Sequence, residues 1–242
     1  ENQWFSILEN LANYVSKLDV LLCKTYISNE YHFCRPMIDS NASKSHVETK
    51  KLRHVLIEHI NTNEIYVPND CQIGDGKIDG VLLLGINMAG KSSYIKSIGI
   101  ALIMAQSGCY VPAETFLFKP YKSIFSRIVS NDNLFKNLSL FAVEMTELRT
   151  ILKNSDENSL VLLDELSNGS ETQSSVSILM ASLMHLSKHK TSFICSTHFH
   201  EVLHFDELHA ISNIVVRHLY VYYDRELDAL VYDRKLKEGS GP

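Results

Sequence analysis

Gly85-Ile86-Asn87-Met88-Ala89-Gly90-Lys91-Ser92 directly follows the apolar run Val81-Leu82-Leu83-Leu84. The octapeptide matches the pattern G-x-x-x-x-G-K-[ST], which cradles phosphates when it lies between a strand and a helix. Its glycines allow successive backbone N–H groups to face an anion, and the positive end of the following helix adds to the attraction. A plain turn between a strand and a helix is the alternative. Because strand, motif and helix occur in the required order, the stretch predicts a phosphate-binding loop.

The chemistry of a nucleotide site assigns parts to individual residues. Lys91 would reach the β- and γ-phosphates, and the Ser92 hydroxyl would complete a Mg²⁺ shell. A second element is the run from Leu160 to Leu163, which ends in Asp164 and Glu165. An acidic pair after a strand is by itself more typical of a polar loop. Together with the phosphate loop it predicts Asp164 as a metal ligand through water and Glu165 as the general base.

The composition favours a globular intracellular protein. The 242 residues are 45% hydrophobic, enough for one large α/β domain and an appendage. No apolar run reaches the roughly 18 residues of a membrane span, and no signal segment precedes the first helix. The five cysteines form no C-x-x-C pair, so neither a zinc site nor a disulfide framework is indicated. The net charge of −5 argues against a broad basic surface, so DNA contact by this segment alone is not inferred and we expect such contact elsewhere.

Periodicity along the chain predicts an amphipathic helix from Trp4 to Leu22, which is either packed on the domain or the end of a longer helical arm. The polar residues 41–51 indicate a loop, so we expect a helical segment over 1–50 and an ATPase domain over 51–242. The missing initial methionine favours a piece of a longer protein. We expect strands at 54–57, 65–67, 81–84, 123–128, 160–163 and 192–195, and helices at 91–106, 140–152 and 174–186. This alternation predicts a mostly parallel sheet flanked by helices.

Further motifs occur in order along the chain. Tyr66-Val67-Pro68-Asn69-Asp70 is similar to FVPND, residues 139–145 to STFMVEM, and residues 196–201 to ATHYHEL. The loop itself is similar to GPNMGGKSTY, residues 163–166 match an acidic strand end, and 53–58 resemble RHPVIE without its proline. These are motifs of the C-terminal ATPase domain of the MutS family of DNA mismatch-recognition proteins. The sequence resembles that domain over nearly its whole length.

The resemblance implies a P-loop NTPase of the ABC type, in which two such domains bind ATP and Mg²⁺ between them. It implies that Tyr66 stacks on the adenine ring, that Ser139 contacts the nucleotide of the partner subunit, and that His198 reports on the γ-phosphate. As bare sequence features, Tyr66 is equally a core tyrosine, Ser139 a helix N-cap and His198 a structural histidine. The implied ATP-binding residues are Tyr66, Gly85, Ile86, Asn87, Met88, Ala89, Gly90, Lys91, Ser92 and Ser93. The implied catalytic residues are Lys91, Glu165 and His198.

The chain also departs from the family pattern. Asn168 stands where the family has an arginine, in a loop that couples the two nucleotide sites, so this coupling is in question. Arg234 aligns with a second aromatic ring that faces the base, and a guanidinium can stack on a base as well. Ala89 replaces a glycine and Ser93 a threonine, and both changes should preserve phosphate binding. The chain ends at Pro242, before the family's closing segment, so we expect the dimerising tail to lie elsewhere.

The first functional hypothesis is therefore an ATPase that switches a DNA clamp as a head-to-tail homodimer. Its DNA would be contacted mainly by upstream domains, with downstream repair proteins as further partners and no membrane contact. The alternatives are a MutS-like ATPase that serves recombination control or ribosome rescue, and a nucleotide-dependent interaction module without hydrolysis. A P-loop kinase is a fourth, and the absence of an Arg-rich lid segment argues against it.

Overall fold

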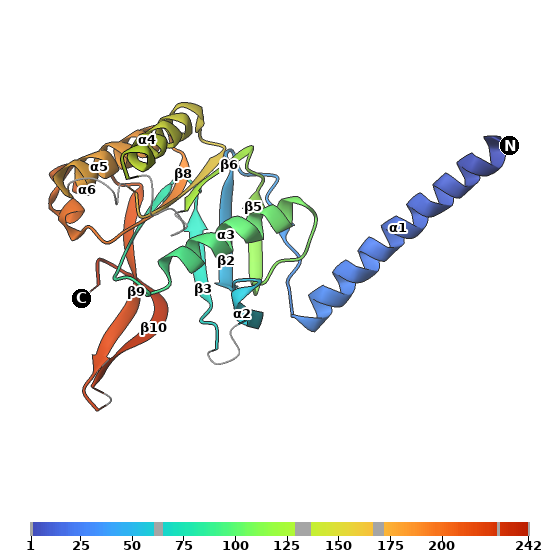
Figure 1. Cartoon of the computed structure of the whole chain (residues 1–242), viewed down its shortest axis with the longest axis horizontal. Coiled ribbons are helices and arrows are strands. Elements are labelled where there is room, and N and C mark those ends of the chain that lie inside the picture. Colours follow the sequence, from blue (N-terminus) through green and yellow to red (C-terminus); the bar gives the residue numbers. More distant parts are fainter. Residues whose placement is uncertain (1, 61–64, 129–136, 167–171, 227, 242) are drawn as a thin grey trace.

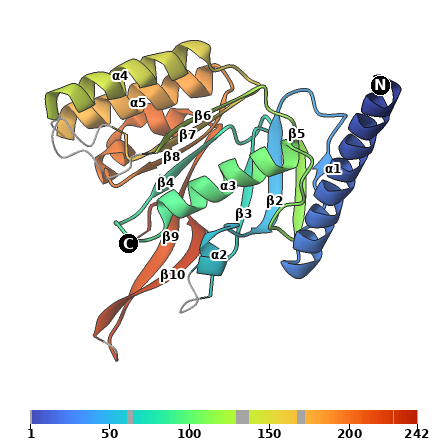
Figure 2. The ribbon, with the colours of Figure 1, turned by 45° about the vertical axis from the view of Figure 1, so that its right-hand side comes forward.

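The computed structural model describes residues 2–60, 65–128, 137–166, 172–226 and 228–241. It is a mixed α/β structure whose two sheets enclose one helix, with further helices on the outer face of the larger sheet (Figures 1 and 2). This confirms the predicted class of parallel strands flanked by helices. None of the helices in the described part of the chain is long and apolar enough to cross a membrane.

The larger sheet has six strands in the order β10-β9-β4-β8-β7-β6. All neighbours are parallel except β9 and β10, which form an antiparallel hairpin. The strands are β4 (Gly80–Leu84), β6 (Ser123–Ile128), β7 (Ser159–Asp164), β8 (Ser192–Thr197), β9 (Ile214–Asp224) and β10 (Ala229–Glu238). The predictions for β4, β6, β7 and β8 are confirmed, whereas β9 and β10 were missed.

The smaller sheet corrects the sequence-based prediction of the region before the loop. Its order is β1-β5-β2-β3, with β1 (Met37–Ile38), β2 (His46–Leu52), β3 (Asn69–Ile73) and β5 (Thr115–Lys119). The predicted loop at 41–51 agrees with the structure only over 41–45. From His46 onward it is wrong, because β2 leaves part of its surface exposed and five of its seven residues are polar. The predicted strands at 54–57 and 65–67 are also wrong. The ring of His54 accepts the N–H groups of Leu56 and Ile57 and begins the short helix α2 (Ile57–Ile60) instead.

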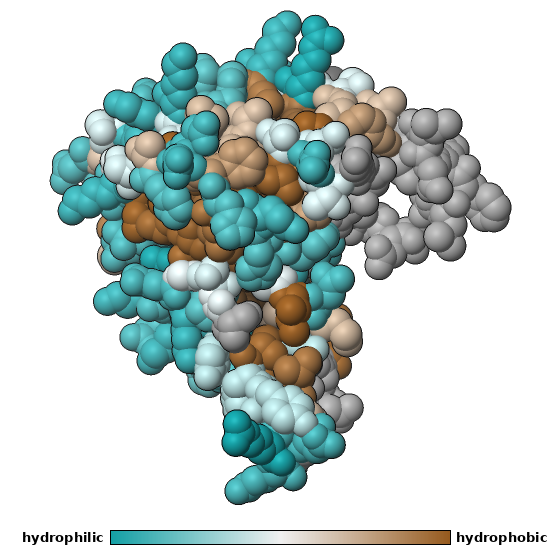
Figure 3. Space-filling model, turned by 90° about the vertical axis from the view of Figure 1, so that its left-hand side faces the viewer, coloured by the Kyte–Doolittle hydropathy of each residue, from teal (hydrophilic) through white to brown (hydrophobic). Residues whose placement is uncertain are grey.

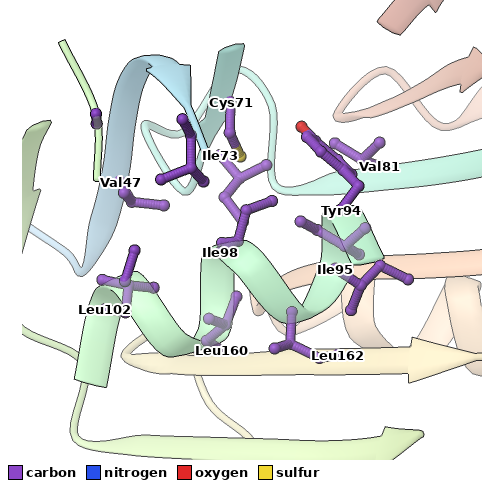
Figure 4. Close-up of a cluster of buried hydrophobic side chains, with 14 of the residues drawn as sticks. Val47, Cys71, Ile73, Val81, Tyr94, Ile95, Ile98, Leu102, Leu160 and Leu162 are labelled. Carbon is purple, nitrogen blue, oxygen red and sulfur yellow. The ribbon is translucent and has the colours of Figure 1, made fainter. Parts of the chain in front are cut away.

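Helix α3 (Lys91–Gln106) lies between the two sheets and has the predicted bounds. Figure 4 shows it with Val47 and Ile73 of the smaller sheet on one side and Leu160 and Leu162 of β7 on the other. Alternate residues of β4, β7 and β8 form a second hydrophobic cluster on the opposite face of the larger sheet. That face is covered by α4 (Asn137–Asn154), α5 (Thr172–Lys188), the 3₁₀ turn at His200–His204 and α6 (Asp206–Ala210). The central strands β4, β7 and β8 are therefore buried on both faces, as the apolar runs in them predict.

Helix α1 (Asn2–Glu30) extends away from this body (Figure 1). Its large apolar side chains are exposed, among them Phe5, Leu8 and Leu11. Near its end, the Lys24 ammonium donates to the Gly108 carbonyl at 3.3 Å. Of the two readings of the amphipathic pattern, the structure shows an extended arm rather than a helix packed on the domain.

Candidate functional site

The loop between β4 and α3 contains positive φ angles, which its glycines adopt without strain. Gly85 has φ = 146° and Gly90 has φ = 103°, both in the region that favours glycine, and Met88 also has a positive φ of 68°. Asn87 and Met88 are exposed at the tip of the loop, whereas Ala89 is fully buried beneath it. The first N–H groups of α3 have no carbonyl partner within the helix, so the loop and helix start together can bind an anion.

Lys91, the first residue of α3, is 4% exposed. Its ammonium donates to the carbonyl oxygens of Gly85 at 2.7 Å and Ile86 at 3.1 Å. It also lies 3.5 Å from Oε1 of Glu165. The lysine therefore lies across the mouth of the loop, where it holds positive charge close to the backbone that would surround a phosphate.

The acidic pair follows β7 in the sheet. Asp164 is buried and accepts a hydrogen bond from the hydroxyl of Ser196, its register partner on β8. The backbone N–H of Glu165 also lies 3.2 Å from this hydroxyl. Glu165 has φ = 50°, a costly conformation for a residue with a side chain. Ser196 thus orients both acidic residues, and sequence reasoning missed it as a site residue although it begins the motif at 196–201.

His198 follows β8 at the same edge of the sheet. The pairing of β4 with β8 places Leu84 beside Thr197, so the segments that continue into the loop and into His198 leave neighbouring strands. The His198 side chain is exposed, and its ring lies 4.4 Å from that of Phe199. Parallel topology thus brings Gly85, Glu165 and His198 to one edge, at the carboxyl ends of the strands where ligands of open α/β sheets bind.

A cavity of 230 Å³ adjoins the loop on the side of the smaller sheet. Tyr66 and Val67 line it together with Arg234 of β10, and burial raises the pKa of Tyr66. The predicted residues Met88, Ala89, Gly90 and Ser93 also line it, and the other lining residues are Ile57, Asn69, Tyr94 and Leu219. The structure therefore joins Tyr66, Arg234 and the loop in one pocket, with Asn69 as a lining residue that the sequence did not single out.

Ser92 is half-buried in the first turn of α3. Ser139 lies in the first turn of α4, but its side chain is not among those described, and Asn168 lies outside the described residues. In the described ranges no three His, Cys, Asp or Glu side chains gather as a metal centre. The hydroxyl of Ser92 and the carboxylate of Asp164 are hard oxygen donors, a set that fits Mg²⁺.

A second hollow of 620 Å³ lies between the loop and the β9–β10 hairpin. It is lined by Gly85 and Ile86 of the loop and by apolar and aromatic residues of the hairpin, including Tyr222 and Leu230. Figure 3 shows this side of the molecule, with apolar surface that reaches the base of the projecting hairpin. Three residues around it, Met88, Tyr222 and Leu230, are 84%, 41% and 52% exposed.

Parallel strands flanked by helices, with a glycine loop at the start of α3, define a mixed α/β protein compatible with a P-loop ATPase. The family model described as MutS domain V matches residues 81–241, and the chain belongs to the MutS family.

Individual relatives agree with this assignment. The chain is 38% identical over 98% of its length to the mutS homolog L359 of Acanthamoeba polyphaga mimivirus. It is 37% identical over 96% to the mitochondrial DNA mismatch repair protein mutS homolog of Sarcophyton glaucum. It is 35% identical over 98% to the DNA mismatch repair protein MutS of Bacillus subtilis. The chain spans about a quarter of each of these relatives, namely 24%, 23% and 27% of their lengths.

Proposed function

We propose that this chain is the ATP-binding and ATP-hydrolysing part of a MutS-type DNA mismatch-recognition protein. The observation that carries the proposal is the cluster at the strand ends, where the ammonium of Lys91 lies between the loop carbonyls and the carboxylate of Glu165. Family membership and the names of the relatives, which describe DNA mismatch repair proteins, support it.

Binding begins at the loop. Lys91 exchanges the carbonyl oxygens of Gly85 and Ile86 for oxygens of the β- and γ-phosphates. The backbone N–H groups of the loop and of the first turn of α3 face the same phosphates, with Asn87 beside the γ-phosphate. The base lies in the 230 Å³ cavity between Tyr66 and Arg234. Ala89, which replaces the family's glycine, is fully buried, and its small side chain should preserve phosphate binding.

Hydrolysis uses the two acidic residues. Ser92 and, through water, Asp164 would hold Mg²⁺, which would neutralise charge on the phosphate oxygens. Glu165 accepts a proton from water as the water oxygen bonds to the γ-phosphorus. The bond between that phosphorus and the bridging oxygen breaks, and ADP and phosphate leave. His198 holds the attacking water or the phosphoryl oxygens as charge develops.

A second copy completes the site, with Ser139 of each copy facing the nucleotide held by the other. The exposed loop residues Ile86 and Met88, and the apolar hollow beside them, support a partner surface close to the nucleotide. In the whole protein this head-to-tail dimer switches a clamp around DNA, which upstream domains contact, and downstream repair proteins read the state of the clamp. A MutS-like ATPase in recombination control or ribosome rescue, or an interaction module without hydrolysis, remains the alternative reading.

The test is Mg²⁺-dependent ATP turnover per chain as the concentration of purified protein is raised. We expect turnover that climbs with concentration because the site is shared between two copies. Constant turnover at all concentrations, with a monomer at the lowest, contradicts the composite site. Failure to bind ATP contradicts the proposed function, and binding without any turnover favours the interaction module.

A further inference from the structure

Strand β10 contains an irregularity beside the nucleotide cavity. Its pairing with β9 shifts between Tyr232 and Leu236, so the residues between them bulge out of the ladder. Arg234 lies in this bulge with φ = 59°, a conformation that L-residues adopt only when their surroundings enforce it. Bulges of this kind redirect a side chain next to a functional site.

The side chain of Asn69 holds the bulge in β10 through two hydrogen bonds to its backbone. The Nδ2 group of Asn69 donates to the carbonyl oxygen of Arg234 at 2.9 Å, and its Oδ1 accepts the N–H of Leu236 at 2.8 Å. The side chain therefore supplies the two backbone partners that the broken ladder lacks. Asn69 is 8% exposed, so water competes poorly for these bonds. An amide is the group required here, because it donates and accepts at the same time.

The two hydrogen bonds of the Asn69 side chain, which we call the Asn69 clamp, also join the two sheets. Asn69 begins β3 of the smaller sheet, and its partners lie on the edge strand of the larger sheet. In the same region the ammonium of Lys235 donates to the Pro68 carbonyl at 2.8 Å, but this lysine is exposed. The buried amide, rather than the lysine, determines the position of the bulge.

The position of the bulge in turn places one wall of the cavity. Arg234 and Tyr66 both line it, together with Gly90 at the end of the loop. A Cβ built on Gly90 would lie 3.9 Å from Cδ of Arg234, so the stem of the arginine runs alongside the loop. Any shift of the bulge moves this wall relative to Tyr66 and leaves the phosphate side of the loop, at Lys91, in place.

We infer that Asn69 is a positioning residue that sets the affinity for the base end of the nucleotide by fixing Arg234 across the cavity from Tyr66. The inference rests on the proposed function. It separates the site into a phosphate part, built by the loop and α3, and a base part, built by a clamp between the two sheets. The two parts take different probes, because inorganic tripolyphosphate carries the phosphates without a base.

The experiment measures the binding of ATP and of tripolyphosphate, each with Mg²⁺, to the purified protein and to Asn69→Ala, Asn69→Asp and Lys235→Ala variants. We expect Asn69→Ala to weaken ATP binding roughly tenfold, the effect of losing one to two net hydrogen bonds, and to leave tripolyphosphate binding within about twofold. Asn69→Asp should behave similarly because a carboxylate cannot donate to the Arg234 carbonyl. Lys235→Ala is the matched control and should bind both probes normally.

A double-mutant comparison tests whether Asn69 acts through Arg234. In an Arg234→Ala background, Asn69→Ala should have little further effect on ATP binding, because the wall is already missing. In steady-state turnover, Asn69→Ala should raise KM and leave kcat unchanged. Amide hydrogen exchange at Leu236 should become faster in Asn69→Ala, which reports loss of the clamp without any nucleotide.

The outcomes separate this inference from the proposed function. If the parent protein binds neither probe, the proposed function fails and the inference fails with it. If the parent binds ATP and Asn69→Ala binds it equally well, only the inference is overturned. Equal weakening of ATP and tripolyphosphate also overturns it, because Asn69 would then act on the site as a whole. Additive effects of Asn69→Ala and Arg234→Ala on ATP binding would overturn the inference as well, because Asn69 would then act independently of Arg234.

Discussion

The ammonium of Lys91 lies 3.5 Å from Oε1 of Glu165, which joins the residue that begins α3 to the residue that follows β7. Their side chains are 4% and 27% exposed, so the pair is shielded from bulk water. The two have opposite roles in the proposed reaction: Lys91 binds the phosphates and Glu165 accepts a proton from water. Replacing each in turn therefore separates binding from hydrolysis.

We predict that Lys91→Ala reduces ATP affinity at least about 100-fold, because the buried charge at the mouth of the loop is lost.

Glu165→Ala should keep ATP affinity within a few-fold and lower turnover by roughly 10²–10⁴-fold, because only the proton acceptor is gone. Equilibrium binding and single-turnover hydrolysis measure the two effects. Lys96→Ala, in the same helix but exposed, is the control for a lost lysine. Equal turnover in Glu165→Ala and the parent removes Glu165 from the mechanism.

A second prediction concerns Ser196, which is fully buried and bonds Asp164 while it contacts the N–H of Glu165. Ser196→Ala should lower turnover roughly 10–100-fold, the usual cost of losing a group that orients a metal ligand. It should also raise the Mg²⁺ concentration needed for half-maximal turnover. A Mg²⁺ titration at saturating ATP measures both effects. An unchanged Mg²⁺ dependence would show that Asp164 needs no help from Ser196.

Ser175→Ala is the matched control for Ser196→Ala. Ser175 is also fully buried but lies in α5, on the far side of the sheet from α3. Its loss should leave the Mg²⁺ dependence unchanged. If both serine variants shift the titration equally, a general loss of packing rather than the orientation of Asp164 explains the effect.

The parts of the fold that the sequence predicts are those in which local pattern and burial agree. Strands β4, β7 and β8 are buried on both faces, and each contains an apolar run, four residues long in β4 and β7 and three residues long in β8. Strand β2 has three exposed residues and five polar residues among its seven, and β10 has a polar stretch at its bulge, so neither stands out from a loop.

The same distinction applies to the site. The glycines, Lys91 and the acidic pair belong to short motifs with a mechanical meaning, so they are visible in the sequence. The clamp between Asn69 and Arg234 joins residues 165 positions apart, and no local pattern encodes it. Arg234 was found only through a family alignment, and its positive φ could not be predicted. Contacts between the two sheets are therefore the part that required the structure.

A third prediction concerns stability. The ammonium of Lys44 lies 2.5 Å from Asp79 Oδ1 and 2.8 Å from the Lys190 carbonyl, and Asn213 donates to the other Asp79 oxygen at 2.9 Å. The Lys44 and Asp79 side chains are only 10% and 2% exposed. Asp79→Ala should lower the free energy of unfolding by about 3–5 kcal/mol because it leaves a buried ammonium without its counter-charge. Urea unfolding followed by circular dichroism measures this change.

The matched control is the ion pair of Lys51 with Glu114, which is also 2.5 Å long but has side chains 65% and 53% exposed. Glu114→Ala should leave the unfolding transition almost unchanged, because water screens this pair. A combined Lys44→Met and Asp79→Leu variant should lose less stability than Asp79→Ala, since no charge is left unpaired. Equal destabilisation by Asp79→Ala and Glu114→Ala would contradict the importance of burial.

The last prediction uses the cysteines as reporters of the core. Burial raises the pKa of Cys71 from 9.0 to about 11 and that of Cys195 to about 12, whereas Cys23 on α1 is exposed. The thiolate is the reactive form, so an aromatic disulfide reagent at pH 8 should label Cys23 quickly. Cys71 and Cys195 should react only after unfolding.

The raised pKa values of the buried thiols also determine whether the free energy of unfolding rises or falls with pH. The folded thiols keep their protons at pH values where the unfolded thiols release them. The contribution of the buried thiols to the free energy of unfolding is therefore complete below about pH 9. It should fall as the pH rises from 9.0 toward 11 for Cys71 and toward 12 for Cys195. In a Cys71→Ala variant this alkaline loss should be smaller, as urea midpoints measured from pH 8 to pH 10.5 would show. Midpoints that rise with pH in the parent protein would contradict the buried, protonated state of these thiols.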